Sequence, residues 1–156
     1  SPHAYGIMRS LIMGGVSTPL LLAVGVQLVC QLFKFITLLV RTRTISWHRL
    51  LAAGGMPSSH TAFVAALSTA IALRAGVGSE LFAIACVFSM ITIYDTIRVR
   101  SAIQINSEAL RQVVAPMPEA TRPATAHDVG HTLAEVGVGL LVGISCAAAA
   151  RALHLL

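Results

Sequence analysis

The sequence predicts an all-α integral membrane protein, a bundle of about four transmembrane helices in one domain covering residues 1–156. Two observations carry this prediction. Hydrophobic residues make up 56% of the chain and charged residues 11%, whereas soluble domains carry about 25% charged residues. The chain also contains four apolar segments near the length that crosses a bilayer, which is about 20 residues.

The four predicted spans cover residues 18–40, 57–73, 79–96 and 131–153. Arg9 and two adjacent glycines interrupt the preceding stretch, so residues 1–16 are expected to form an interfacial lead-in to a helical core at residues 18–153. Residues 98–130 hold four arginines, three prolines and an irregular apolar stripe. This composition predicts a partly helical excursion along the membrane surface.

Connecting the spans in order places four polar clusters on one face of the membrane, which we call the polar side. The clusters are Lys34, Arg41 and Arg43; Ser58 to His60; Asp95, Arg98 and Arg100; and His131 with Glu135. Seven arginines fall on this side and three on the other. The positive-inside rule therefore predicts that the polar side faces the cytoplasm, stroma or matrix, in a bacterial inner membrane or an organellar membrane.

The second predicted span begins with a run of glycines, Pro57, two serines and His60. Proline in the first helical position and a serine near the cap suit a helix start, whose N–H donors and positive dipole end favour a phosphate group. His60 would stand in the first turn, within reach of such an anion. The alternative is a well-capped helix entering the membrane with its histidine at headgroup level.

Lys34 lies about two turns before the end of the first span, where a charge is costly unless it snorkels to the interface or faces a polar cavity. Asp95 precedes two arginines, with which it could form a structural ion pair. His131 and Glu135 are four residues apart and share one helical face. A carboxylate in this position can orient an imidazole and raise its basicity, although a simple pair at a helix start is the alternative.

Two rows of small residues at a spacing of four predict close packing of the second span on the fourth. The rows are Ala62, Ala66 and Ala70, and Gly139, Gly143 and Ala147. Their contact would bring His60 and His131 to the same level. The three cysteines lie singly inside apolar segments and indicate core positions, so no disulfide framework, metal or cofactor is expected. The basic residues flank the spans instead of forming one patch, which argues against nucleic acid as a partner.

The polar side is predicted to hold two histidines, one of them supported by a carboxylate, together with cations and a helix start. This arrangement suits phosphoryl transfer without a metal. One imidazole would attack phosphorus while the other protonates the leaving oxygen. The cations and amides would stabilise the charge on the equatorial oxygens.

Three motifs resemble the divergent branch of the type 2 phosphatidic acid phosphatase family, which is related to acid phosphatases and vanadium-dependent haloperoxidases. They are the run at residues 54–62, Ile-Tyr-Asp at 93–95 followed by Val99-Arg100, and Gly-His-Thr at 130–132 followed by Glu135-Val136. The resemblance covers about residues 20–153. Its first and last motifs are specific, and its middle motif is degraded.

The resemblance implies a role for each matching residue. It casts His131 as the nucleophile that forms a phosphohistidine, Glu135 as its orienting carboxylate, and His60 as the general acid. Ser58 and Ser59 are implied phosphate ligands, as are Lys34 and Arg41, which resemble a Lys-x6-Arg-Pro motif in which Thr42 replaces the proline. Arg43 is an equally good alignment to Arg41. Arg100 is the candidate to substitute for an arginine that the wider superfamily has just before the nucleophilic histidine, and Asp95 has a supporting role.

The chain departs from the family pattern in the middle motif. The branch usually reads Gly-Val-Arg-Arg after its aspartate, where this chain has Arg-Val-Arg-Ser at residues 98–101, and its later Gly-x-Gln appears as Gln-Ile-Asn at 104–106. The arginine expected just before His131 is missing. Two functions therefore stay open: a phosphatase acting on a lipid or polyprenyl phosphate monoester, and a catalytically silent relative.

The two functions imply different partners. A phosphatase would meet its lipid phosphate among membrane lipids, with the headgroup at the polar side. A silent relative would act as an accessory subunit, forming a homo-oligomer or a larger membrane complex, in an organelle for example, through its small-residue helix faces. A transporter with a proton relay is disfavoured because four spans leave little room for a pathway and the two halves show no internal repeat.

Overall fold

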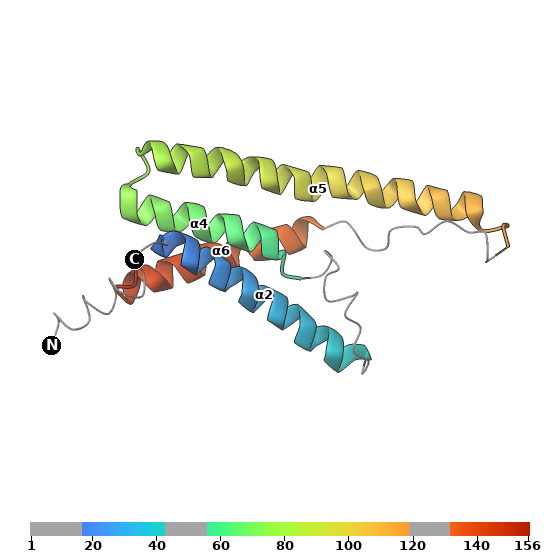
Figure 1. The fold of residues 1–156 in the computed structure, drawn as a ribbon, viewed down its shortest axis with the longest axis horizontal. Coiled ribbons are helices and arrows are strands. Elements are labelled where there is room, and N and C mark those ends of the chain that lie inside the picture. Colours follow the sequence, from blue (N-terminus) through green and yellow to red (C-terminus); the bar gives the residue numbers. More distant parts are fainter. Residues whose placement is uncertain (1–16, 43–55, 119–131) are drawn as a thin grey trace.

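The computed structural model describes residues 17–42, 56–118 and 132–156, and all regular structure in these ranges is helical. The helices are α2 (Thr18–Thr42), α4 (Ser59–Ala75), α5 (Glu80–Val114) and α6 (Leu133–Ala152), arranged as in Figure 1. The predicted all-helical class is therefore confirmed.

Three of the helices are long and apolar enough to cross a membrane. These stretches are Thr18–Val40, Glu80–Val114 and Leu133–Ala152, with mean hydropathies of 1.9, 1.6 and 1.9. The remaining described helix, α4, has 17 residues, a length of about 26 Å. It packs extensively against α2, α5 and α6, which make little contact with one another (Figure 1). The shortest helix is thus the centre of the bundle.

The small-residue rows meet where the sequence predicts. A Cβ atom added to Gly139 would lie 2.6 Å from the carbonyl oxygen of Ser58, and one added to Gly143 would lie 2.5 Å from that of Ala62. The members of both rows, Ala62, Ala66, Ala70, Gly139, Gly143 and Ala147, are all buried. The predicted direct packing of α4 on α6 is therefore confirmed.

Helix α2 also packs on this part of α4, where Ala23, Val26 and Cys30 form a buried cluster with Ala62 and Ala66. Val142 and Cys146 of α6 pack against the same cluster. All three cysteines are free thiols. Cys30 is buried, as predicted for a small core residue.

Two serines join α4 to α5 in the middle of the bundle, a contact that the sequence analysis did not predict. The hydroxyl oxygens of Ser68 and Ser89 lie 2.6 Å apart. Each is also within hydrogen-bonding distance of a carbonyl oxygen of its own helix, 2.8 Å to Val64 for Ser68 and 2.7 Å to Ala85 for Ser89. Hydrogen bonds between membrane helices stabilise by about 0.6 kcal/mol on average.

We expect Ser89→Ala to lower the stability of the chain by about 0.6 kcal/mol, because Ser68 can still donate to a carbonyl of its own helix. Unfolding of Ser68→Ala, Ser89→Ala and the double variant in detergent measures the effect. The double variant should lose less than the two single losses combined, since either single change already breaks the shared bond. Strictly additive losses would show that the two hydroxyls do not interact.

Helix α5, which corresponds to the third predicted span, is longer than predicted. The apolar run suggested an end near Thr96, but α5 continues to Val114. Residues 98–114 contain no glycine or proline, and they include alanine, leucine, arginine, glutamine and glutamate, which favour helix. The arginines that follow Asp95 therefore do not end the helix, and the first half of the predicted excursion, residues 98–114, is a direct extension of α5.

Candidate functional site

The starts of α4 and α6 lie against each other at one end of the bundle. The backbone N–H of Ser58 donates to the carbonyl oxygen of Glu135 over 3.1 Å, and Gly139 packs on the same turn of α4. Both helices run away from this contact in the same direction (Figure 1). Ser58, Ser59 and His60 of α4 and Glu135 of α6 are therefore neighbours, and we call this group the helix-start junction.

Ser58 is the N-cap of α4, with an extended backbone at φ −67° and ψ 106°. Its Oγ accepts from the hydroxyl of Thr61 over 2.9 Å and from the Thr61 N–H over 3.5 Å. Pro57 precedes the cap, so it does not occupy the first helical position as the sequence analysis expected. Ser58 and Ser59 are 0% and 1% exposed. Ser58 thus stabilises the helix start, and phosphate binding by either serine stays a prediction.

His60 is the second residue of α4 and is half-buried. Its Nδ1 atom is buried. His60 follows the buried Ser58 and Ser59 in the chain, so its backbone lies close to the bond between Ser58 and Glu135 at the start of α6. That His60 and His131 lie at the same level stays a prediction, because His131 is outside the described residues.

Glu135 has a structural role at the start of α6. Its Oε2 accepts from the N–H of Thr132 over 3.0 Å, and its own N–H donates to the Thr132 hydroxyl over 3.2 Å. This reciprocal pair is a capping box, whose Thr-x-x-Glu signature is readable in the sequence and was missed. A carboxylate offers about four acceptor positions, so the cap leaves capacity for an imidazole N–H.

Lys34 lies on α2, one turn after Cys30. Cys30 belongs to the cluster that packs on Ala62, which is one turn inside α4. Because α2 runs toward the end at which α4 begins (Figure 1), the next turn of the same face carries Lys34 toward the helix-start junction. The residue is half-buried.

The remaining predicted site residues are not brought to the junction by the described structure. Arg43 and His131 lie outside the described residues. Arg41 and Arg100 belong to α2 and α5, but their side chains are outside what the structure describes. Asp95 is exposed on α5.

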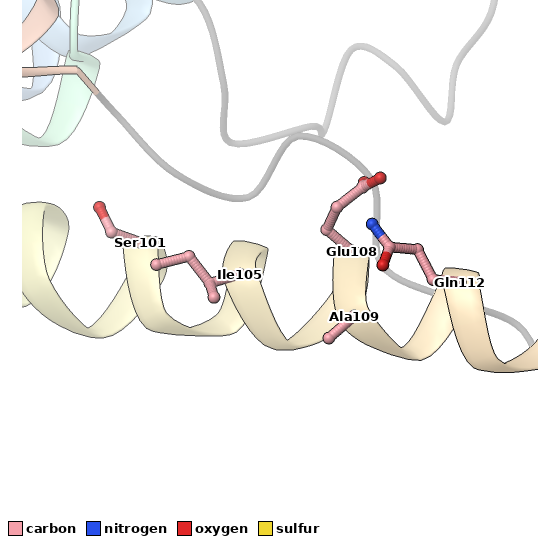
Figure 2. Close-up of a pocket in the computed structure, with 5 residues that line it drawn as sticks. All are labelled: Ser101, Ile105, Glu108, Ala109 and Gln112. Carbon is pink, nitrogen blue, oxygen red and sulfur yellow. The ribbon is translucent and has the colours of Figure 1, made fainter.

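A shallow hollow runs along one face of α5, beyond the bundle (Figure 2). It is lined by Ser101, Ile105, Glu108, Ala109 and Gln112. None of these five residues belongs to the predicted site. The hollow and the helix-start junction are therefore separate features of the described structure.

The sequence model of the divergent PAP2 family matches residues 16–146. The chain belongs to this family. The resemblance seen in the motifs is thereby confirmed, and the matched range includes α2, α4, α5 and most of α6.

A curated relative of this divergent PAP2 protein is the uncharacterized membrane protein YuiD of Bacillus subtilis (strain 168). The two sequences are 40% identical over 82 residues, which is 53% of this chain and 52% of the relative. The chain thus matches about half the length of that relative. No solved structure matches the chain. The membrane relative and the three long apolar helices identify an integral membrane protein.

Proposed function

We propose that this divergent PAP2 protein is a membrane-embedded phosphatase that hydrolyses a lipid or polyprenyl phosphate monoester without a metal. The observation that carries the proposal is the 3.1 Å bond from the Ser58 N–H to the Glu135 carbonyl. This bond connects the start of α4, which carries the Pro-Ser-Ser-His motif, to the start of α6, which follows His131 in the chain. Residues from two distant motifs can thereby act on one phosphate group.

In the proposed reaction, a ring nitrogen of His131 attacks phosphorus. A P–N bond forms, the P–O bond to the lipid breaks, and His60 gives its proton to the leaving oxygen. Water then attacks the phosphohistidine, with His60 accepting its proton, and inorganic phosphate leaves. Glu135 keeps the His131 imidazole oriented throughout.

The proposed phosphate ligands are cations and hydroxyls near the junction, namely Lys34, Arg41, Arg43, Arg100, Ser58 and Ser59, with Asp95 supporting them. The lipid tail stays in the bilayer while its headgroup reaches the polar side. By the excess of arginine there, this side faces the cytoplasm, stroma or matrix of a bacterial or organellar membrane.

One observation favours the second candidate function, a silent relative that serves as a subunit of a membrane complex. Ser58 caps α4 and Glu135 caps α6. Both residues could therefore be retained for the fold alone. An experiment on Glu135 has to separate its capping role from its role beside His131.

Glu135→Gln provides this separation, because glutamine also completes a capping box. We expect unchanged thermal stability and a loss of at least about tenfold in phosphate release, since the neutral amide cannot stabilise an imidazolium. The measurement is phosphate release from a panel of lipid phosphates in liposomes with a chelator present.

Thr132→Ala is the matched control. It removes the cap hydroxyl at a cost of about 1 kcal/mol but keeps the carboxylate. Its phosphate release per folded molecule should stay near that of the native chain. Full activity in Glu135→Gln would show that the reaction does not need the Glu135 carboxylate. A native chain that is well folded but inactive on every lipid phosphate of the panel would favour the silent subunit.

A further inference from the structure

Two glutamine side chains lie inside the membrane span of α2. Gln27 and Gln31 belong to the apolar stretch Thr18–Val40, away from both of its ends, and both are half-buried. Neither amide forms a hydrogen bond with any group in the part of the chain that the structure describes. An amide that meets only hydrocarbon is costly, so a polar partner within the bilayer would stabilise these two side chains.

The two glutamines share one flank of α2 with Lys34. Gln27, Gln31 and Lys34 follow one another at spacings of four and three residues, which places them in a line along the helix. This line adjoins the buried side of α2, because Gln27 comes one turn after Ala23 and Lys34 one turn after Cys30. Helix α2 runs toward the helix-start junction (Figure 1). The amides therefore continue the line of Lys34 from the junction into the bilayer.

Helix α4 has a matching line of half-buried residues, His60, Phe63 and Leu67, at spacings of three and four. Phe63 and Leu67 pack against the buried cluster that α2 forms with α4. The same face of α4 therefore carries His60 at its polar end. We call the border between the two lines the α2–α4 seam. It has basic groups at the junction, with amides and apolar side chains deeper in the membrane.

We propose that Gln27 and Gln31 bind the acyl-ester carbonyls of a lipid phosphate that lies along the α2–α4 seam. This inference rests on the proposed phosphatase function, which places the phosphate at the junction. From Lys34, Gln31 lies about 4.5 Å and Gln27 about 10 Å deeper along α2. In a diacylglycerol phosphate, the two ester carbonyl carbons lie five and six bonds from phosphorus, about 6–8 Å in an extended chain. The carbonyl oxygens can thereby reach the depth of the amides, whose N–H groups donate to them.

The amides distinguish between the two substrate classes of the proposed function. A polyprenyl phosphate has only hydrocarbon beyond its phosphate, so it would leave both amides without an acceptor. A diacylglycerol phosphate offers two carbonyl acceptors, and its acyl chains then continue beside Phe63 and Leu67. The chemistry of the seam therefore selects an acyl-ester lipid phosphate as the substrate.

Binding of two matched lipid analogues tests this subsite. Both are non-hydrolysable phosphonates with equal chain lengths, one with two acyl esters and the other with two alkyl ethers, so they differ only in the carbonyl groups. The native full chain in mixed micelles should bind the diacyl analogue at least about fivefold more tightly than the dialkyl analogue. Gln31→Leu should reduce this preference, and Gln27→Leu combined with Gln31→Leu should abolish it. Gln112→Leu makes the same substitution on the exposed end of α5 and should keep the preference.

Phosphate release from a diacylglycerol phosphate, measured in parallel, separates this subsite from the phosphatase proposal. A native chain that prefers the diacyl analogue but releases no phosphate would support the subsite and contradict the phosphatase. Equal affinity of the native chain for the two analogues, or binding of neither, would overturn the subsite whatever the activity. A double variant that keeps the diacyl preference would also overturn it, and a loss of stability without lipid in that variant would assign the amides to contacts between helices.

Discussion

Replacing Gly143 with alanine is expected to separate α4 from α6 and to destabilise the folded chain by about 1–3 kcal/mol. The new Cβ atom would lie 2.5 Å from the carbonyl oxygen of Ala62, 2.7 Å from Cβ of Ala65 and 2.8 Å from the backbone nitrogen of Ala66. No flexible side chain is available to move aside, so the two helix backbones must part. Phosphate release should fall as well, since the helix-start junction depends on this contact.

Gly137→Ala is the matched control on the same helix. A Cβ atom there meets nothing within 4 Å, and alanine is a better helix former than glycine by about 1 kcal/mol. Thermal unfolding of both variants in one detergent compares them. Equal losses of stability would show that the close approach at Gly143 does not hold the bundle together.

Substitutions of His131 and His60 are expected to give the largest losses of phosphatase activity. His131→Ala should reduce phosphate release to background, because the nucleophile is gone. His60→Ala should slow hydrolysis of an alkyl phosphate by about 10²- to 10⁴-fold, the usual contribution of a general acid. An aryl phosphate should lose much less in His60→Ala, since its leaving oxygen departs without a proton.

A third histidine provides the control for these variants. His154 lies at the far end of α6, is exposed, and has a φ of 57°. His154→Asn suits this left-handed backbone and should keep full activity. If His60→Ala slows the aryl and alkyl phosphates equally, His60 does not act as the general acid.

The helix packing was predictable where it depends on local spacing. The alanines of α4 and the glycines of α6 recur every four residues, which places each set on one face and allows those faces to approach closely. This pairing also brought residues 58–60 next to Glu135, because both helices start at the same end. The proximity of the two helix starts thus follows from spacing alone.

Other features depend on information that spacing does not contain. The contact of Ser68 with Ser89 requires the relative rotation of two helices, which no single segment specifies. The length of α5 was underestimated because arginines mark the end of an apolar run but do not break a helix. The Glu135 cap was readable from its spacing to Thr132, but the sequence analysis interpreted this carboxylate only as a partner of His131 or as a simple pair at a helix start.

The most direct test of the phosphatase proposal is detection of the phosphohistidine. The native chain in liposomes is mixed with a labelled lipid phosphate in the presence of a chelator, quenched at alkaline pH and digested. The proposal predicts label on the peptide that contains His131, and none in His131→Ala. A folded chain that releases no phosphate and carries no label on His131 would contradict the account and leave the silent membrane subunit.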